Sequence, residues 1–517
     1  MGKSFFLYGP SGSGKSTLGQ RLATKLGLKF RDLDAEIVEQ AGMNIPAIFA
    51  EERERGFRIR EKRVLQEVIG ADPVVVALGG GTLLDPESRS LVSSEGDVLC
   101  LRATTETLLA RLHHEDDRPL LEGDREERMR RLLEERSHHY DSFTLQLNTE
   151  ELTLEQATRE VQIALGAFRV EGMGLGYDVR IGSGSLDDLG GAMRSRGLKG
   201  SVVVVSDENV AKLYAERTAV SLQQAGYEVH EVLFPAGEQN KTLETVSRLW
   251  TAFVQARLER QSTIVALGGG VVGDLAGFAA AIFLRGVSWV NVPTSLLAMV
   301  DASVGGKTGA NLPQGKNLIG AFHAPRLVLV DPCTLSTLPG FELRNGLAEV
   351  VKTGVIGDPK LFARCEEGEA VVRSHLDEMV RRSVAVKIDI IEEDPYEAGI
   401  REALNLGHTV GHAVEKVSNF RLHHGEAVAI GMIAEARISQ WLGLAEDRLA
   451  DRLRGALKGL KLSVEVPGDL SKDALVAAMR LDKKRAEGKV RFSLPVRVGE
   501  VKTGIEVDEA EVLELLE

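Results

Sequence analysis

Four of the eleven histidines fall between His408 and His424, a grouping that suits a metal site. His408 and His412 are four residues apart, so on a helix both rings project from one face, one turn apart. His423 and His424 follow after a loop-like stretch, next to Glu426. Imidazole and carboxylate are the usual protein ligands of a catalytic zinc. The second pair and the flanking glycines favour such a site over a helix that merely carries two histidines.

The first residues of the chain contain a phosphate-binding signal. GPSGSGKST at 9–17 fits the pattern G-x-x-x-x-G-K-[ST], follows an apolar run, and precedes a segment expected to be a helix from Lys15 to Leu26. Glycines let backbone amides wrap phosphates, and a helix N-terminus adds the positive end of its dipole. Lys15 can reach the β- and γ-phosphates, and the Ser16 hydroxyl can bind Mg²⁺. The motif predicts nucleotide binding but leaves the acceptor open.

Candidates for handling an acceptor follow the next apolar run. RDLD at 31–34 supplies Asp32, which could help hold Mg²⁺, and Asp34, which could accept a proton from a substrate hydroxyl. Arg58 lies in a charge-rich helical stretch, where a solvated helix face is an equally good explanation.

Glycines mixed with isolated charges mark a second binding region. GGGVVGDLAGF at 268–278 lacks the G-x-G-x-x-G fingerprint, so alone it indicates only a close approach of ligand to backbone. Residues 292–325 then carry Asp301, Lys307 and Lys316 among many glycines. Lysines suit a phosphate or carboxylate as point charges. This composition is typical of a binding surface.

One pair of opposite charges lies between this region and the histidines. Glu349 and Lys352 are three residues apart, so on a helix they would share one face. A solvent-exposed salt bridge is the alternative explanation of the pair.

At least two α/β domains are expected to position these candidate binding and metal-ligating residues. Short apolar runs alternate with helical segments over the first 150 residues, which predicts a parallel sheet with flanking helices. Residues 151–170 are expected to form a closing helix. A second α/β series begins at Tyr177, and after Pro332 the sequence is mostly helical. The predicted domains are a P-loop domain at 1–165, a linker at 166–176, a nucleotide-binding α/β domain at 177–332 and a helical metal-binding domain at 333–517.

Composition narrows the classes of function. A chain of 517 residues with 43% hydrophobic and 27% charged residues is expected to be a soluble protein of several domains. A net charge of −13 argues against a nucleic-acid partner. Three widely spaced cysteines suit a reducing compartment, and no apolar run reaches membrane-spanning length. We predict a cytoplasmic protein without a membrane partner.

The N-terminal motifs together resemble shikimate kinase. The loop at 9–17 is followed in family order by DLD at 32–34, GGGT at 79–82, RPLL at 118–121 and ER…Y at 135–140. The resemblance implies ATP as co-substrate with Mg²⁺ on Ser16 and Asp32, and a lid around 112–124. It assigns shikimate to Asp34, Arg58, Gly80 and Arg136, and ATP to Gly12, Ser13, Gly14, Lys15, Ser16, Thr17 and Arg118.

The remaining motifs resemble 3-dehydroquinate synthase over about residues 173–517. They include SDENV at 206–210, PAGEQNKT at 235–242, REALNLGHTVGHAVE at 401–415 and HGE at 424–426. The resemblance implies NAD and a Zn²⁺ or Co²⁺ ion held by Glu349, His408 and His424, with His412 nearby and His423 a bystander. It assigns NAD to Asp207, Asn209, Glu238, Lys241, Gly269, Gly270, Asp274, Thr294 and Ser295. It assigns the substrate to Asp301, Lys307, Lys316, Asn317, Lys352, Lys387, Arg401, Asn405 and Lys483, with Arg285 reaching into a partner subunit because the family is dimeric.

The two resemblances imply a bifunctional enzyme of the shikimate pathway. One half would phosphorylate shikimate to 3-phosphoshikimate, with Lys15, Asp34 and Arg118 as catalytic residues. The other would convert 3-deoxy-D-arabino-heptulosonate 7-phosphate to 3-dehydroquinate and release phosphate, with Lys307, Lys352, His412 and Arg401 as catalytic residues. The alternative is a small-molecule kinase fused to a metal-dependent alcohol or glycerol dehydrogenase. That enzyme would need fewer phosphate-binding cations.

Overall fold

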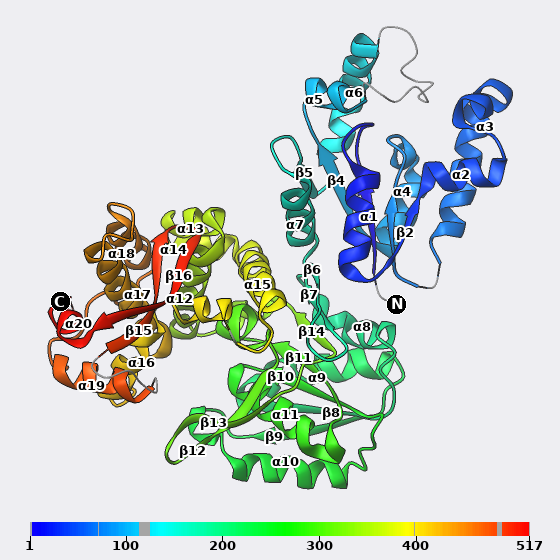
Figure 1. The fold of residues 1–517 in the computed structure, drawn as a ribbon. Coiled ribbons are helices and arrows are strands. Elements are labelled where there is room, and N and C mark those ends of the chain that lie inside the picture. The colour runs from blue at the N-terminus through cyan, green and yellow to red at the C-terminus, as the bar shows by residue number, and fades with distance from the viewer. Residues whose placement is uncertain (1–2, 71, 113–124, 398, 483–488, 516–517) are drawn as a thin grey trace. The chain divides into compact units, whose positions relative to one another are not determined.

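The chain divides into two compact units (Figure 1). The computed structural model describes residues 3–70, 72–112, 125–397, 399–482 and 489–515. The first unit comprises residues 1–169 and 191–197, and the second comprises residues 170–190 and 198–517. Within the described ranges, no helix combines the length and the apolar character needed to cross a bilayer.

A five-stranded parallel sheet forms the first unit, in the order β2-β3-β1-β4-β5. The central strand β1 is buried throughout, because Phe6 and Tyr8 face one apolar core while Phe5 and Leu7 face another. A strand that is apolar on both faces is typical of a parallel sheet covered by helices on both sides. The sheet confirms the predicted α/β fold. Its strands are β1 (Ser4–Tyr8), β2 (Lys29–Asp32), β3 (Val74–Ala77), β4 (Gly96–Arg102) and β5 (Leu145–Asn148).

Helices cover this sheet and begin where the sequence supplies caps. The first helix spans the predicted Lys15–Leu26, between Gly14 and Gly27, which both have left-handed backbone. Asp32 caps the second helix by accepting from the backbone N–H of Asp34 and Ala35. The helices are α1 (Lys15–Leu26), α2 (Leu33–Ala41), α3 (Ile45–Val68), α4 (Pro86–Glu95), α5 (Thr105–Leu112), α6 (Arg125–Asp141) and α7 (Leu154–Leu165).

The predicted closing helix over 151–170 is shorter than expected. α7 ends at Leu165 because Gly166 adopts φ 60, and Ala167–Val170 form the strand β6.

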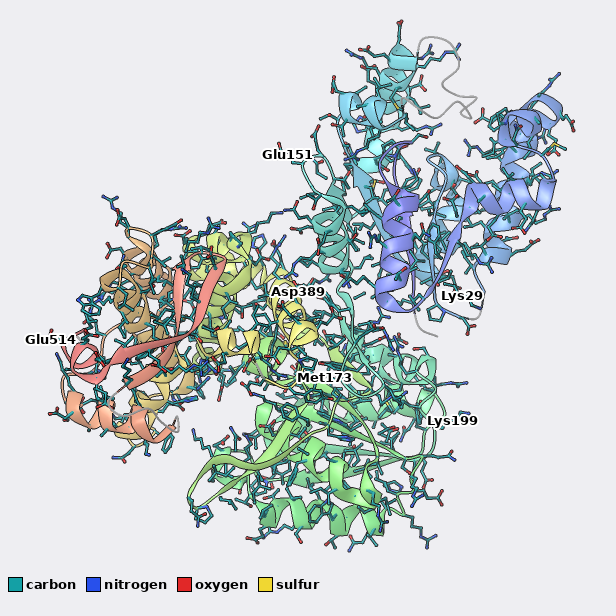
Figure 2. The ribbon with its side chains drawn as sticks, viewed as in Figure 1. Lys29, Glu151, Met173, Lys199, Asp389 and Glu514 are labelled. Carbon is teal, nitrogen blue, oxygen red and sulfur yellow. The ribbon has the colours of Figure 1, made fainter. Side chains whose placement is uncertain are left out.

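Charged side chains such as Lys29 and Glu151 are exposed at the surface of the first unit (Figure 2).

The second unit contains six neighbouring strands in the order β7-β14-β11-β10-β8-β9, which belong to a seven-stranded sheet with β6 at its edge. All pairs from β7 to β9 are parallel, as expected for a nucleotide-binding α/β domain. Strands β8, β10 and β11 are buried runs that pack against α10 and α11. The elements are β7 (Tyr177–Ile181), α8 (Leu189–Ser195), β8 (Val202–Asp207), α9 (Glu208–Gln224), β9 (Val229–Phe234), α10 (Leu243–Gln255), β10 (Thr263–Gly268), α11 (Gly270–Ile282), β11 (Ser288–Pro293) and β14 (Leu327–Val330).

An antiparallel hairpin, β12 (Lys307–Leu312) with β13 (Gly315–Phe322), lies within the glycine-rich region. A Cβ on Gly309 would lie 2.5 Å from the carbonyl oxygen of Ile319, so the two strands approach too closely for a side chain there. Sequence patterns did not predict this hairpin, because its glycines interrupt the alternation that marks a strand.

The chain after Pro332 is mainly helical, as predicted, but an antiparallel hairpin that was not predicted precedes its last described helix. α16 and α17 pack against each other, and α17 also packs against α12. The elements are α12 (Gly340–Gly357), α13 (Pro359–Glu366), α14 (Glu369–Ser374), α15 (Leu376–Glu393), α16 (His408–Val417), α17 (His424–Trp441), α18 (Leu449–Gly459), α19 (Lys472–Asp482), β15 (Lys489–Arg497), β16 (Glu500–Asp508) and α20 (Glu509–Leu515).

Candidate active sites

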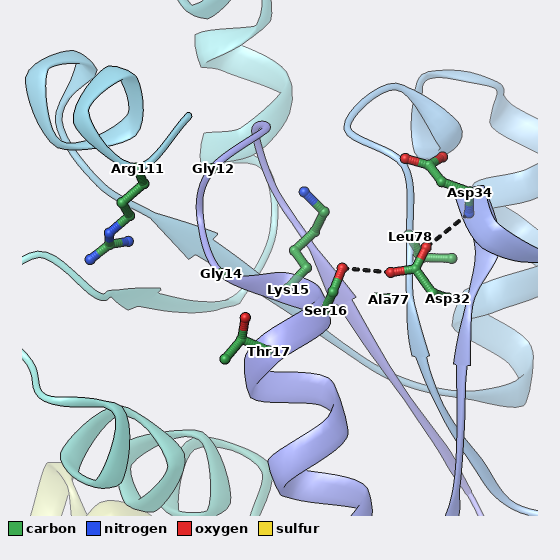
Figure 3. A pocket seen from close by; sticks show the side chains of 10 residues that line it. All are labelled: Gly12, Gly14, Lys15, Ser16, Thr17, Asp32, Asp34, Ala77, Leu78 and Arg111. Carbon is green, nitrogen blue, oxygen red and sulfur yellow. Dashed lines mark hydrogen bonds between the residues drawn. The ribbon is translucent and has the colours of Figure 1, made fainter. Parts of the chain in front are cut away.

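The P-loop lines a cavity of about 260 Å³ in the first unit (Figure 3). Lys15 Nζ donates to the carbonyl oxygens of Gly9 at 3.0 Å and Pro10 at 2.9 Å. Ser16 Oγ donates to Asp32 Oδ2 at 2.5 Å. A hydroxyl beside a carboxylate offers the oxygen ligands that Mg²⁺ prefers. The lining residues are Gly12, Gly14, Lys15, Ser16, Thr17, Asp32, Asp34, Ala77, Leu78 and Arg111.

Backbone geometry makes this loop a cradle for an anion. Gly12 and Gly14 have φ of 79° and 94°, a region that favours glycine. A Cβ on Gly12 would lie 2.8 Å from the carbonyl oxygen of Leu108. The N-terminus of α1 opens on the same cavity, where backbone N–H groups of its first turn can bind phosphate oxygens.

The glycine turn at 79–81 gathers the predicted acceptor residues. A Cβ on its first glycine would lie 3.1 Å from Asp34 Oδ1, and one on its third would lie 2.6 Å from Arg58 NH2. Arg136 NH1 donates to the carbonyl oxygen of the middle glycine, Gly80, at 3.2 Å. The guanidinium groups of Arg58 and Arg136 can bind the carboxylate of a hydroxylated acid, because guanidinium pairs with carboxylate in a planar fork. The carboxylate of Asp34 can then face a hydroxyl group of the same ligand.

Supporting residues surround this turn, and of these only Thr82 and Tyr140 belong to motifs noted in the sequence. Glu61 Oε2 accepts from Arg58 NH1 at 2.7 Å, and Thr82 Oγ1 donates to Glu61 Oε1 at 2.6 Å. Burial raises the pKa of Glu61, although Arg58 and Thr82 oppose the shift. The hydroxyls of Tyr8 and Tyr140 donate to the same glycine carbonyl that Arg136 contacts, at 3.2 and 2.9 Å. The contacts of Thr82 with Glu61 and of the two tyrosines with Gly80 join segments that are distant in the sequence.

Arg111 is a further residue that the sequence patterns missed. It lines the cavity and donates to Thr149 Oγ1 at 3.0 Å and to the Thr149 carbonyl oxygen at 2.8 Å. The predicted Arg118 lies outside the described residues, as does most of the expected lid at 112–124.

In the second unit, Glu349, His408 and His424 converge from α12, α16 and α17. Glu349 Oε1 lies 3.3 Å from His424 Nε2 and 3.6 Å from His408 Nε2. All three residues offer ligand atoms within 4.8 Å of one another. The i, i+4 partner His412 is exposed and belongs to a different group, with Glu415 and His424. His423 instead stacks near Phe341, with ring centroids 5.3 Å apart.

These three side chains fit a divalent metal. Two imidazole nitrogens and a carboxylate oxygen form the donor set of many catalytic zinc sites. Both carboxylate oxygens of Glu349 are buried and, among the described residues, accept no hydrogen bond of normal geometry. Burial and the neighbouring Lys352 lower the pKa of His408 to about 3. Burial alone would lower the pKa of His424, but Glu349 and Glu415 raise it to about 10.

A buried charge network surrounds this cluster. Lys352 Nζ lies 2.5 Å from Glu349 Oε2, and Lys387 Nζ lies 2.6 Å from Asp301 Oδ1. The solvent salt bridge considered for Glu349 and Lys352 is therefore excluded, because both side chains are buried. Burial would raise the pKa of Asp301, but Lys387 and Lys352 lower it to about 2. Two buried lysines, each paired with a carboxylate, therefore lie beside the candidate metal ligands.

Three further predicted cations lie around the β12–β13 hairpin and the loop after α15. Lys307 Nζ lies 2.5 Å from Glu397 Oε2, and Lys316 Nζ lies 3.4 Å from Glu415 Oε1. Arg401 NH2 donates to the carbonyl oxygen of Gly305 at 3.2 Å. Their protein partners are acidic or carbonyl groups, so an anionic substrate would compete for the same nitrogens.

The predicted dinucleotide residues gather at one edge of the seven-stranded sheet. Asp207, Gly268 and Pro293 end the adjacent parallel strands β8, β10 and β11. The carboxyl ends of parallel strands are where α/β sheets bind ligands. A Cβ on Gly269 would lie 3.5 Å from Ser295 Oγ, and the Thr294 N–H donates to the Gly268 carbonyl oxygen at 3.0 Å.

Polar groups extend this edge toward the hairpin. Lys241 Nζ lies 2.5 Å from Asp274 Oδ2 and donates to Asn317 Oδ1 at 2.5 Å. Asn311 Nδ2 donates to Glu238 Oε1 at 2.7 Å. Asp207 accepts from the Asn209 N–H at 2.9 Å, and Gly270 begins α11.

Three predicted residues remain, and one of them lies outside the described ranges. Asn405 ends a short helical turn three residues before His408. Arg285 is exposed and has a φ of 68°. It lies on a turn of its own, far from the metal ligands in the sequence. Lys483 lies outside the described residues.

Residues 231–345 match the family model for the N-terminal part of 3-dehydroquinate synthase, and residues 346–485 match the model for its C-terminal part. A 3-dehydroquinate synthase of Synechocystis sp. is 49% identical over 332 residues, which cover 63% of this chain and 92% of that protein. The chain belongs to the 3-dehydroquinate synthase family. A solved 2-deoxy-scyllo-inosose synthase, complexed with carbaglucose-6-phosphate, NAD⁺ and Co²⁺, is 26% identical with a TM-score of 0.62. The match covers 68% of this chain and 99% of that one.

The kinase part is a second enzyme domain fused to the synthase. Residues 11–165 match the shikimate kinase family model. A shikimate kinase from Acinetobacter baumannii, solved with shikimate, is 35% identical over 32% of this chain and 93% of that chain, with a TM-score of 0.31. The predicted fusion and its place in the shikimate pathway are confirmed, whereas the roles of the individual site residues remain predictions.

Proposed function

We propose that the chain catalyses two reactions, ATP-dependent phosphorylation of shikimate and conversion of 3-deoxy-D-arabino-heptulosonate 7-phosphate to 3-dehydroquinate with release of phosphate. The observation that carries the synthase reaction is the convergence of Glu349, His408 and His424 on one point. The substrate is an anionic sugar acid, and buried lysines adjoin this point. A dehydrogenase of uncharged alcohols would gain nothing from those cations.

In the synthase, Zn²⁺ or Co²⁺ at these three ligands would polarise a substrate oxygen while NAD takes up and returns a hydride. Lys307, Lys316 and Arg401 would bind the phosphate and carboxylate, since each lies beside an acidic or carbonyl group that an anionic substrate could replace. Buried Lys352 and Lys387 would hold negative charge that develops on the substrate, in a low-dielectric site where such charges interact strongly.

Two other groups would complete the synthase site. His412 is exposed beside His408, with ring centroids 5.2 Å apart, and would accept or return a proton at the edge of the site. NAD would lie at the carboxyl edge of β8, β10 and β11, where the glycines before α11 leave room for its phosphates.

In the kinase, Asp34 would accept a proton from the shikimate hydroxyl while Arg58 and Arg136 hold its carboxylate. Lys15 would hold the ATP phosphates, and Ser16 with Asp32 would bind Mg²⁺. The grouping of Asp34, Arg58, Gly80 and Arg136 around one glycine turn supports this assignment. The relative solved with shikimate supports the choice of acceptor.

We also propose a homodimer formed through the synthase part, with Arg285 serving the partner's site. Leu284 and Arg285 have φ of 50° and 68°, an unfavourable conformation that persists only where the fold demands it. Sedimentation velocity would show a dimer. Arg285→Ala should lose synthase activity and keep kinase activity; a fully active Arg285→Ala would contradict the assignment.

A paired assay on the purified full-length protein tests both reactions. One arm measures phosphate release from the heptulosonate phosphate with NAD⁺ and Co²⁺, and the other measures ADP formation that depends on shikimate. Asp34→Asn should abolish only the kinase reaction, and His408→Ala only the synthase reaction. The proposal fails if neither substrate turns over. Net accumulation of NADH from an alcohol would instead support a dehydrogenase.

A further inference from the structure

One buried carboxylate, Glu415, lies between the candidate metal ligands and the hairpin cation Lys316. Glu415 Oε2 lies 3.2 Å from His424 Nδ1, and its Oε1 lies 3.4 Å from Lys316 Nζ. The residue is 7% exposed and comes from α16, seven residues after the ligand His408. Both of its oxygens are therefore engaged with groups of the proposed synthase site.

The two ring nitrogens of His424 face different carboxylates. Nε2 points to Glu349, within the candidate metal cluster, while Nδ1 points to Glu415. A neutral imidazole that binds a metal through Nε2 carries its proton on Nδ1. A carboxylate that accepts this proton's hydrogen bond fixes the tautomer and the orientation of the ring, and it makes the ligand more basic.

A second metal at His412, Glu415 and His424 is the competing explanation, because their ligand atoms also lie within 4.8 Å of one another. That ion would need His424 Nδ1 without its proton while Nε2 serves the first ion, which requires an imidazolate. His412 is also exposed, whereas Glu415 is buried. A hydrogen bond from His424 Nδ1–H to Glu415 requires neither an imidazolate nor an exposed ligand.

We propose that Glu415 is a positioning residue that holds His424 in its metal-binding tautomer and orientation, which sets the affinity of the site for its metal. This inference rests on the metal site of the proposed function. Lys316 completes the arrangement: its ammonium group lies near the second oxygen of Glu415 and 4.2 Å from the centroid of the Phe420 ring. The contact with Phe420 holds the ammonium group beside the carboxylate of Glu415.

Metal affinity of the full-length protein tests the proposal without relying on turnover. Metal-free protein would be titrated with Co²⁺ in competition with a chromophoric chelator. Glu415→Ala should weaken binding by about 10–100-fold, the usual effect of removing such a partner. Glu415→Gln should fall between Glu415→Ala and wild type, because its amide oxygen still accepts from Nδ1–H but carries no charge. The absorption spectrum of bound Co²⁺ should change in both variants.

Lys416→Gln provides the matched control, because Lys416 is the next residue on α16 and is exposed. It should bind Co²⁺ as wild type does. Thermal unfolding of each metal-free variant separates a binding effect from a folding effect, and Glu415→Gln decides the question if Glu415→Ala does not fold.

Wild-type affinity and an unchanged Co²⁺ spectrum in Glu415→Gln would overturn the inference while leaving the metal site intact. Two ions bound per wild-type chain and one per Glu415→Gln chain would also overturn it, since Glu415 would then be a ligand. A wild-type protein that binds no divalent metal would overturn the proposed metal site together with this inference.

Discussion

Lys352 Nζ lies 2.5 Å from Glu349 Oε2 in an ion pair whose side chains are 2% and 1% exposed. Lys352 also donates to the carbonyl oxygen of Leu404 at 2.9 Å. Glu349 is at the same time the carboxylate of the candidate metal cluster. Each partner loses its main counter-charge when the other is removed. Because Glu349 would also bind the metal, the stability of the helical domain is linked to the occupancy of the metal site.

Lys352→Met should destabilise the metal-free synthase part by about 3–5 kcal/mol, because it leaves a buried carboxylate without its counter-charge. Added Co²⁺ should restore part of the loss by supplying positive charge to Glu349. Urea unfolding followed by tryptophan fluorescence measures this, as Trp250, Trp289 and Trp441 all lie in the second unit. Exposed Lys212→Met is the control. A loss below about 1 kcal/mol would show that the pair contributes little.

Gly81→Ala should impair shikimate binding with little effect on folding. Its Cβ would lie 2.6 Å from Arg58 NH2, so the guanidinium must shift away from its bond to Glu61. The KM for shikimate should rise about tenfold, the effect of about 1.4 kcal/mol of lost binding, while the KM for ATP stays unchanged. Steady-state kinetics check both constants. Gly70→Ala, whose Cβ meets nothing within 4 Å, should behave as wild type; equal kinetics in both variants would contradict the proposed role of Arg58.

Thiol reactivity should distinguish Cys333 from the other two cysteines. Cys333 is exposed, whereas burial raises the pKa of Cys100 to about 11 and that of Cys365 to about 12. A raised thiol pKa leaves little thiolate at pH 8, and thiolate is the reactive form. Native protein with a disulfide reagent at pH 8 should therefore show one fast thiol, absent in Cys333→Ser, and three thiols after unfolding. A second fast thiol in the native protein would contradict the burial of Cys100 or Cys365.

Local patterns predicted the elements well and the long-range partners poorly. The helix over Lys15–Leu26 followed from an apolar run and a glycine loop of the phosphate-binding pattern, all within 30 residues. Spacing alone pointed to His408 with His412, yet the structure joins His408 to Glu349, which is 59 residues earlier, and only the family resemblance suggested that partner. Neither Glu61 nor Glu415 was singled out, although Glu415 ends the motif at 401–415, because a buried carboxylate in a helix resembles an exposed one until its partners are known.

Adjacent histidines allow the sharpest test of the metal cluster. His424 directs Nε2 at Glu349, whereas His423 precedes α17 and lies beside Phe341, with its backbone N–H donating to Glu426 at 3.0 Å. His424→Ala should therefore abolish Co²⁺ binding and synthase activity, while kinase activity persists because the P-loop cavity lies in the other unit. His423→Ala should retain the metal and both activities, because the backbone bond to Glu426 does not need the imidazole. Equilibrium dialysis with Co²⁺ and the paired assay measure both variants. If His423→Ala lost Co²⁺ while His424→Ala still bound it, the metal ligand would be His423. That result would refute the cluster of Glu349, His408 and His424.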